Sequence, residues 1–135
     1  MFHFFPGLCS KTLTGHTDYV MALALLPNSW LASGSGDTKI MVWDITKTSP
    51  LYTLIGRTSW IRGLVVIHDE FLAACSHDMT IRIWSLRNFT EVKSWQASND
   101  YVISLAFDTH LNLLASGDMS ELVKVWDSNL WNTGK

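Results

Sequence analysis

The chain has 135 residues, enough for one domain of average size with a substantial buried core. Apolar residues make up 47% of it and charged residues 16%, a balance that excludes an intrinsically disordered chain. Ten Lys and Arg against twelve Asp and Glu give a formal charge of −2, without any block of like charges. Sequence-independent nucleic-acid binding needs a clustered excess of cations, so we expect no nucleic-acid partner.

The first ten residues, MFHFFPGLCS, form an apolar N-terminal segment (1–10) without a basic region. They are too short for a membrane span or for the apolar region of a signal peptide. We therefore expect no membrane partner and a cytoplasmic, intracellular location. Cys9 and Cys75 allow at most one disulfide, and the setting of Cys75 in AACSHD indicates a buried thiol inside a strand.

Residues 11–55 predict short strands separated by turn signals. Apolar residues of 20–25 occupy both alternating sets, which is typical of a strand that is covered on both faces. Pro27-Asn28-Ser29 and Gly36-Asp37 supply turn residues between the runs. We therefore predict strands over 11–14, 20–25, 30–35, 39–45 and 51–55.

The rest of the chain repeats this order. Four strands are predicted over 61–67, 71–76, 80–86 and 91–95, and then three over 102–107, 113–116 and 122–126. No segment keeps an apolar period of 3.6 residues, so we expect almost no helix and an all-β fold.

Three copies of one unit account for this order. The first, LTGHTDYVMALALLPNSWLASGSGDTKIMVWD, spans 13–44, and more divergent copies span 54–85 and 95–127. Their closing tryptophans, Trp43, Trp84 and Trp126, are 41 and 42 residues apart. A period near 40 with a Gly-His opening and a Trp-Asp close resembles the WD40 family, whose repeats form four-stranded blades of a β-propeller.

The resemblance implies three four-stranded antiparallel propeller blades within a WD40-like segment over 11–128. The blades would occupy about 19–55, 60–96 and 101–128, with a spare outer strand at 11–14 and a C-terminal stub at 129–135. Propellers have roughly four to eight blades, so this one is incomplete or is completed by self-association. Three interpretations remain open: a fragment of a larger propeller, a homodimer whose copies exchange spare strands to complete a six-bladed ring, or an open arc of three blades.

The resemblance also gives a structural role to a tetrad in the first repeat. In the family, a Trp, a Ser or Thr, a His and an Asp form one hydrogen-bonded chain, and here these residues are His16, Ser33, Asp37 and Trp43. The other repeats keep only part of it: Asp78 and Trp84 in the second, Ser116 and Trp126 in the third. Arg57 and Ser98 replace the histidine, Ala74 replaces the serine of the second repeat, and Ser120 replaces the aspartate of the third. We therefore predict a full tetrad in the first blade alone and mainly apolar packing in the other two.

His16, Ser33 and Asp37 also have the residue types of a hydrolase triad, so a hydrolase is kept as an alternative. The serine lies inside a predicted strand, LASGSG, instead of on a sharp strand-to-helix turn, and no second Gly-rich loop could form an oxyanion hole. We therefore predict that the protein is not an enzyme. The five His are scattered and no C-x-x-C, H-x-x-x-H or phosphate-loop spacing occurs, so we expect no metal and no cofactor.

Candidate binding residues lie where the resemblance places the entrance of the propeller channel. Tyr19, Trp60 and Tyr101 each precede the first inner strand of a repeat. We expect them to form a rim with the neighbouring side chains Met21, Arg62, Ile103, His77 and Met119. Tyr, Trp, Met and Arg are enriched at the centres of protein interfaces, whereas the alternative is that the aromatic side chains only pack against adjacent loops.

Together these observations predict a non-catalytic protein–protein interaction scaffold that binds a peptide or a protein loop on the rim. A self-assembling structural ring without an external ligand is the alternative.

Overall fold

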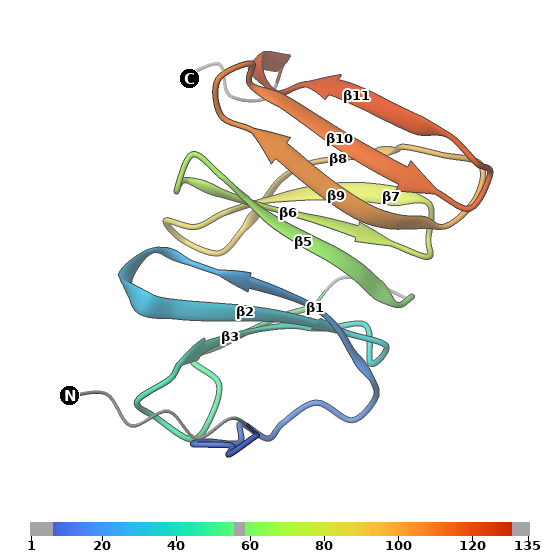
Figure 1. The fold of residues 1–135 in the computed structure, drawn as a ribbon. Coiled ribbons are helices and arrows are strands. Elements are labelled where there is room, and N and C mark those ends of the chain that lie inside the picture. The colour runs from blue at the N-terminus through green and yellow to red at the C-terminus, as the bar shows by residue number, and fades with distance from the viewer. Residues whose placement is uncertain (1–6, 56–58, 131–135) are drawn as a thin grey trace.

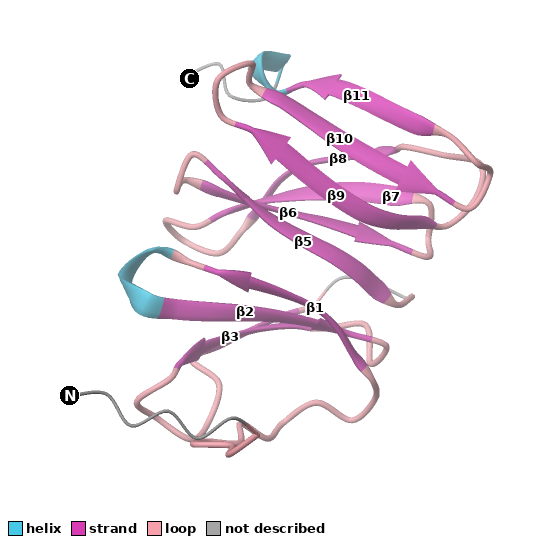
Figure 2. Ribbon diagram, viewed as in Figure 1, coloured by secondary structure: helices cyan, strands magenta, loops and turns pink. Residues whose placement is uncertain are grey.

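The computed structural model describes residues 7–55 and 59–130 and contains three antiparallel sheets stacked one on the next. In Figure 1 the first sheet lies at the bottom of the stack and the third at the top. The described residues include only two helical turns, η1 (Pro27–Ser29) and η2 (Ser128–Leu130), as Figure 2 shows. The all-β prediction is confirmed.

Each sheet is a meander in which strands that follow one another in sequence are hydrogen-bonded neighbours. The first sheet consists of β1 (Val20–Leu25), β2 (Trp30–Ser35), β3 (Ile40–Asp44) and β4 (Tyr52–Leu54). The second consists of β5 (Ile61–Ile67), β6 (Phe71–Ser76), β7 (Thr80–Ser85) and β8 (Glu91–Gln96). The third consists of β9 (Val102–Asp108), β10 (Leu113–Asp118) and β11 (Val123–Asp127).

The structure differs from the prediction at the outer strands. In the described part of the chain the third sheet has three strands, and η2 follows β11 where the sequence predicts only a stub. The strand predicted over 11–14 does not form. An outer strand needs the free edge of a third strand, and β4 and β8 already occupy those edges in the first two sheets. The open edge of β11 belongs to the third sheet, which lies at the opposite end of the stack from the first sheet and residues 11–14.

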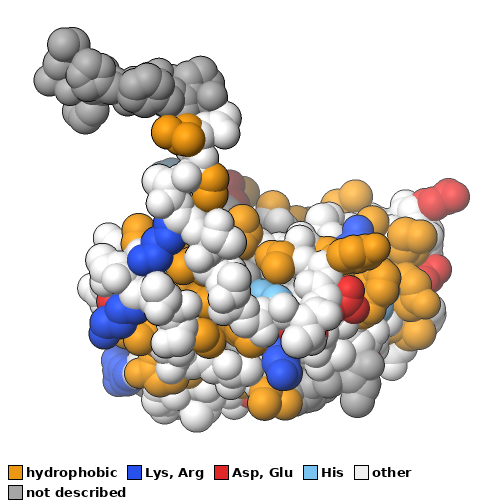
Figure 3. All heavy atoms as spheres, turned by 90° about the horizontal axis from the view of Figure 1, so that it is seen from below, with side chains coloured by type: hydrophobic (Ala, Val, Ile, Leu, Met, Phe, Trp, Pro, Cys, Tyr) orange, Lys and Arg blue, Asp and Glu red, His pale blue; other side chains and the backbone are white. Residues whose placement is uncertain are grey.

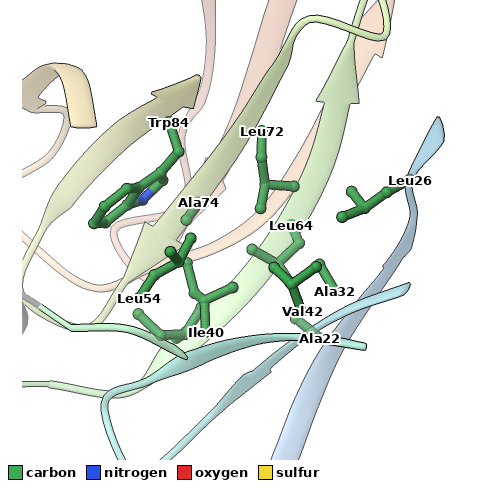
Figure 4. Packing of buried hydrophobic residues seen from close by; sticks show 11 residues of the cluster. Ala22, Leu26, Ala32, Ile40, Val42, Leu54, Leu64, Leu72, Ala74 and Trp84 are labelled. Carbon is green, nitrogen blue, oxygen red and sulfur yellow. The ribbon is translucent and has the colours of Figure 1, made fainter. Parts of the chain in front are cut away.

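Apolar side chains fill the space between the first two sheets. Leu64, Leu72 and Trp84 of the second sheet pack in one cluster with Ile40 and Val42 of the first, as Figure 4 shows. Small residues on β2 let the sheets approach: a Cβ atom added at Gly34 would lie only 2.5 Å from Cγ2 of Ile61. Close packing at this boundary therefore requires the glycine.

A second cluster joins the second sheet to the third. Ile67, Ile81 and Ile83 pack there with Val102 and Leu114, and all five are buried. Cys75 belongs to the same cluster and is a free thiol, as predicted. Burial raises its pKa to about 12, so the thiol stays protonated at neutral pH.

The outer faces of the stack remain open. Val42, Ile83 and Val125 occupy equivalent places, each opposite an alanine of the second strand of its sheet. The first two are fully buried by the following sheet, whereas Val125 is 60% exposed. At the other end Leu25 is 81% exposed, and Figure 3 shows hydrophobic side chains spread over the outer side of the first sheet. The three sheets therefore do not close into a ring.

We expect Gly34→Ala to lower the free energy of unfolding by about 1–3 kcal/mol, because the new methyl group overpacks against the buried Ile61. Gly117→Ala is the matched control at the equivalent place in the third sheet, where the added Cβ meets only the hydroxyl of Ser104. Urea denaturation of both variants measures the difference. Equal losses would show that sheet contact at Gly34 is not the constraint.

Candidate functional site

Four side chains of the first blade form one chain of hydrogen bonds. The indole Nε1–H of Trp43 donates to Ser33 Oγ at 2.8 Å, and Ser33 Oγ lies 2.7 Å from His16 Nε2. His16 Nδ1 lies 2.8 Å from Asp37 Oδ2. Because a carboxylate can only accept, Nδ1 carries the imidazole proton that faces Asp37. In that neutral tautomer Nε2 accepts from the Ser33 hydroxyl, whose oxygen accepts the indole N–H. The predicted tetrad is therefore assembled.

The carboxylate of Asp37 ties this chain to the turn after β2. Burial opposes its ionisation, but hydrogen bonds from His16 and from the backbone amides of Lys39 and Thr17 outweigh burial and hold the pKa of Asp37 below its usual value. This stabilisation is present above the ordinary carboxyl pKa and is lost as the pH falls through the lowered one. The tetrad thus fastens the segment before β1 to the β2–β3 turn.

The hydrogen bonds among His16, Ser33 and Asp37 have the connectivity of a hydrolase triad, but Ser33 is not placed to act as a nucleophile. Its side chain lies inside β2, paired with Leu23 on one side and Met41 on the other, and the residue is 3% exposed. Its oxygen already accepts the Trp43 N–H and its proton is directed to His16. A substrate carbonyl has no path to the hydroxyl, so the geometry supports a structural role for Ser33, in which it links the segment before β1 to the rest of the sheet.

The second blade replaces the tetrad with a different network. Ala74 occupies the serine place, and Trp84 Nε1 is buried with no hydrogen-bond partner among the described residues. Asp78 still anchors its turn by accepting the amide of Thr80. Arg82 lies 3.5 Å from Asp78 Oδ2 and 3.2 Å from Glu91 Oε1, a link between turn and outer strand that the tryptophan spacing did not reveal. Arg57 lies outside the described residues.

The third blade keeps one bond of the tetrad. Trp126 Nε1–H donates to Ser116 Oγ at 2.9 Å, while Ser98 at the histidine place accepts the amide of Asp100. Asp118 takes over the turn, because its Oδ1 accepts the amides of Ser120 and Leu122. Alignment of the repeats puts Ser120 at the place of Asp37 and does not single out Asp118, although an Asp two residues before a Ser is an ordinary signal of such a turn. Among the described residues, the complete hydrogen-bonded chain of four side chains occurs in the first blade alone.

The predicted rim residues meet at the end of each blade where the first inner strand begins. The same backbone hydrogen bond recurs in each blade. The amide of the residue just after β2, β6 or β10 donates to the carbonyl of the residue just before β1, β5 or β9. The pairs are Gly36 to Tyr19 at 2.9 Å, His77 to Trp60 at 3.0 Å and Met119 to Tyr101 at 2.9 Å. This bond brings the predicted neighbours together in every blade.

A stack of rings joins the second and third blades on this rim. The His77 ring stacks with Trp60 at 5.1 Å between centroids and with Tyr101 at 4.1 Å, and the His77 and Tyr101 planes are 4° apart. Arg62 Nη1 lies 3.1 Å from His77 Nε2, and because a guanidinium only donates, Nε2 accepts and the imidazole is neutral. Desolvation and the charge of Arg62 both lower the pKa of His77. Trp60 is still 38% exposed and Tyr101 42%.

The first blade contributes differently to the rim. Tyr19 is 72% exposed, and no ring contact of Tyr19 is present among the described residues. Its neighbour is Gly36, where an added Cβ would lie 2.9 Å from a carboxylate oxygen of Asp18. Of the other rim residues, Met119 is exposed and Met21 and Ile103 are half-buried. The rim is therefore organised on two blades and open on the first.

Within the part of the chain that the structure describes, no three His, Cys, Asp or Glu side chains are close enough to hold a metal ion. No helix of that part is long and apolar enough to cross a bilayer.

Comparison with known proteins identifies all three repeats. The family model described as "WD domain, G-beta repeat" matches residues 7–44, 48–85 and 89–127. The chain is 44% identical over 46 residues to the Notchless protein homolog of Arabidopsis thaliana, covering 33% of this chain and 10% of that protein. It is 49% identical over 39 residues to the transcriptional repressor rco-1 of Neurospora crassa, covering 28% and 6%. It is 43% identical over 42 residues to the pre-mRNA-splicing factor PRP46 of Kluyveromyces lactis, covering 30% and 10%. Each match therefore spans about a tenth of the relative or less.

We expect Ser33→Ala to lower the free energy of unfolding by about 1–3 kcal/mol, because it leaves the buried indole N–H of Trp43 without an acceptor. Ser116→Ala is the matched variant in the third blade and should cost less, because Trp126 is only half-buried. Thermal unfolding and an esterase assay with p-nitrophenyl acetate are measured on both. A Ser33→Ala protein with unchanged melting temperature and a lost esterase signal would contradict the bracing role.

Proposed function

Because the chain belongs to the WD40 family of G-beta repeat proteins, we propose that it is a non-catalytic scaffold that binds a peptide or a protein loop on its rim. The rim consists of Tyr19, Met21, Trp60, Arg62, His77, Tyr101, Ile103 and Met119. Related proteins are named for transcriptional repression and pre-mRNA splicing, which supports a role in a multi-protein assembly. The formal charge of −2 favours a protein over a nucleic acid as partner, and two free cysteines favour an intracellular place of action.

The ring stack on the rim carries this proposal. Trp60 and Tyr101 come from different blades but both stack on His77, so their rings are ordered before any ligand arrives. A surface that is already ordered loses less conformational entropy on binding. Large aromatic side chains and arginine dominate the energetics of protein interfaces, and both are present here. The alternative role, packing against neighbours, accounts for the stacked faces but not for the exposed ones.

Arg62 adds hydrogen-bond donors beside this stack of rings. Its guanidinium has five N–H donors, and a rim contact with His77 uses one of the Nη1 donors. The remaining donors can bind carbonyl or carboxylate oxygens of a bound segment. This arrangement suits a peptide whose apolar side chain packs on Trp60 or Tyr101 while its backbone carbonyl accepts a hydrogen bond from Arg62.

A second candidate is self-assembly into a ring, which the open outer faces favour. Val125 is exposed, whereas the equivalent Val42 and Ile83 are buried. Residues 11–14 have the same place in the first repeat as the outer strands β4 and β8 have in the next two repeats, yet they form no strand. In this arrangement the first blade of one copy covers β11 of another, and residues 11–14 pair with the open edge of β11.

For the rim, we expect Trp60→Ala and Tyr101→Ala to reduce capture of a cellular partner about tenfold or more, as truncation of an interface anchor does. Affinity capture from a cell extract, quantified by mass spectrometry, compares them with the wild type and with Tyr19→Ala. Leu111→Ala is the control, because Leu111 is an exposed apolar residue on the β9–β10 turn at the opposite end of the third blade. Equal capture by the wild type and all three rim variants would end the rim proposal.

For the ring, sedimentation should give about twice the 15.2 kDa mass of one chain, and Val125→Glu should return the monomer by placing a charge in the contact. A wild-type protein that stays monomeric over the accessible concentration range would exclude the ring and leave the rim proposal standing.

A further inference from the structure

A groove lies between the first two blades at the end opposite the rim. It has a volume of about 680 Å³, within the roughly 300–1,000 Å³ range of sites that hold small ligands and side chains. The turn after β1, the turn after β5 and the loop between β7 and β8 form its walls. Its apolar lining includes Leu26, Trp30, Phe71, Leu86, Phe89 and Val92.

Backbone hydrogen bonds and ring contacts hold these walls in place. The amide of Leu86 donates to the Glu70 carbonyl at 2.9 Å, and the amide of Phe89 donates to the Ser85 carbonyl at 2.8 Å. The Phe89 ring then stacks on Tyr52 at 4.5 Å and on Trp30 at 6.3 Å, across the boundary between the blades. The groove is therefore formed before any ligand binds.

Phe89 adopts an unfavourable backbone conformation to reach this position. Its φ of 55° lies in the left-handed region, which a large side chain adopts only at a cost. Despite that cost the ring stays only half-buried, facing both the groove and its aromatic neighbours.

Charged side chains at the edge of the groove determine which ligand it suits. Asp69 and Glu70 lie side by side on the β5–β6 turn and are exposed. No basic side chain of the described residues forms an ion pair with either. Arg87 is the single cationic residue in the lining, so two carboxylates stand against one guanidinium. The charge of the groove is therefore complementary to a cation.

We propose that this groove binds an extended segment of a partner protein that presents an apolar side chain next to a Lys or Arg. The apolar side chain enters against Trp30 and Phe89, and the basic side chain pairs with Asp69 and Glu70. This surface is separate from the rim, because the two lie at opposite ends of the strands. One scaffold can therefore hold two segments at once.

The test uses three small probes on the full chain: N-acetyl-Leu-Lys-amide, N-acetyl-Leu-Glu-amide and N-acetyl-Gly-Lys-amide. The reporter is the Trp30 indole N–H signal in a ¹⁵N NMR spectrum, assigned with Trp30→Phe. We expect a saturable shift with the Leu-Lys probe, and binding about threefold to tenfold weaker with the other two, the size expected for one exposed ion pair and one apolar side chain. The Trp60 indole signal should not move.

Variants separate the contributions to binding. Asp69→Asn with Glu70→Gln, both at exposed positions, should abolish the preference for the Leu-Lys probe over the Leu-Glu probe, because Arg87 is then the one charged side chain left in the lining. Trp60→Ala is the matched control and should leave the Trp30 shift unchanged, so that a failure here is distinct from a failure of the rim. Absence of a shift at Trp30, or equal binding of all three probes to the wild type, would overturn the proposal. A Trp30 shift that depends on protein concentration without any probe would assign the groove to a second copy and overturn it as well.

Discussion

Apolar contact between neighbouring sheets is the interaction on which this structure depends. A single antiparallel sheet of three or four short strands buries too little surface to be stable alone, so each blade needs another against its face. The second blade meets this condition on both faces: Leu72 packs toward the first sheet, and Ile81 and Ile83 pack toward the third. The end blades meet it on one face only, which is why apolar residues such as Leu25 and Val125 are exposed there.

Side-chain hydrogen bonds add to this apolar packing, and the three blades differ in how many bonds of the tetrad they contain. The first blade has the full chain from Trp43 to Asp37, the second has an indole N–H without a described partner, and the third keeps only the Trp126–Ser116 bond. The first and third blades, each open on one face, keep at least the bond between tryptophan and serine, whereas the second blade, which is covered on both faces, has lost it. Bracing by polar groups and burial by a neighbour are thus two different means of holding a blade together.

Much of the fold could be predicted because period-2 alternation and turn residues are local signals. The strands from β1 to β11 lie where these signals place them, and the hydrogen-bonded tetrad of the first blade is the one that the resemblance to the WD40 family implies. Residues 11–14 could not be placed in this way, since their strand depends on a partner edge that the local sequence does not specify.

For the proposed rim, the position of each residue along its blade was predictable, but the contacts between the side chains were not. Alignment of the repeats is enough to bring Trp60 and His77 to the same end of the second blade. The stack that links them to Tyr101 depends on the angle between two blades and on a hydrogen bond from Arg62, and neither is encoded in spacing. Asp118 was missed for a similar reason, because an anchor that moves by two residues breaks the alignment while preserving the turn.

Gly36 makes the two ends of the proposed rim different. Where the second and third blades present His77 and Met119, the first presents bare backbone, because the Asp18 carboxylate already fills the space that a side chain would need. An extended chain lying across the blades would therefore meet the unstacked ring of Tyr19 beside bare backbone at one end, and the stacked rings of His77 and Tyr101 at the other. Such a surface can tell a sequence from its reverse, so the order of residues in a ligand would matter as much as its composition.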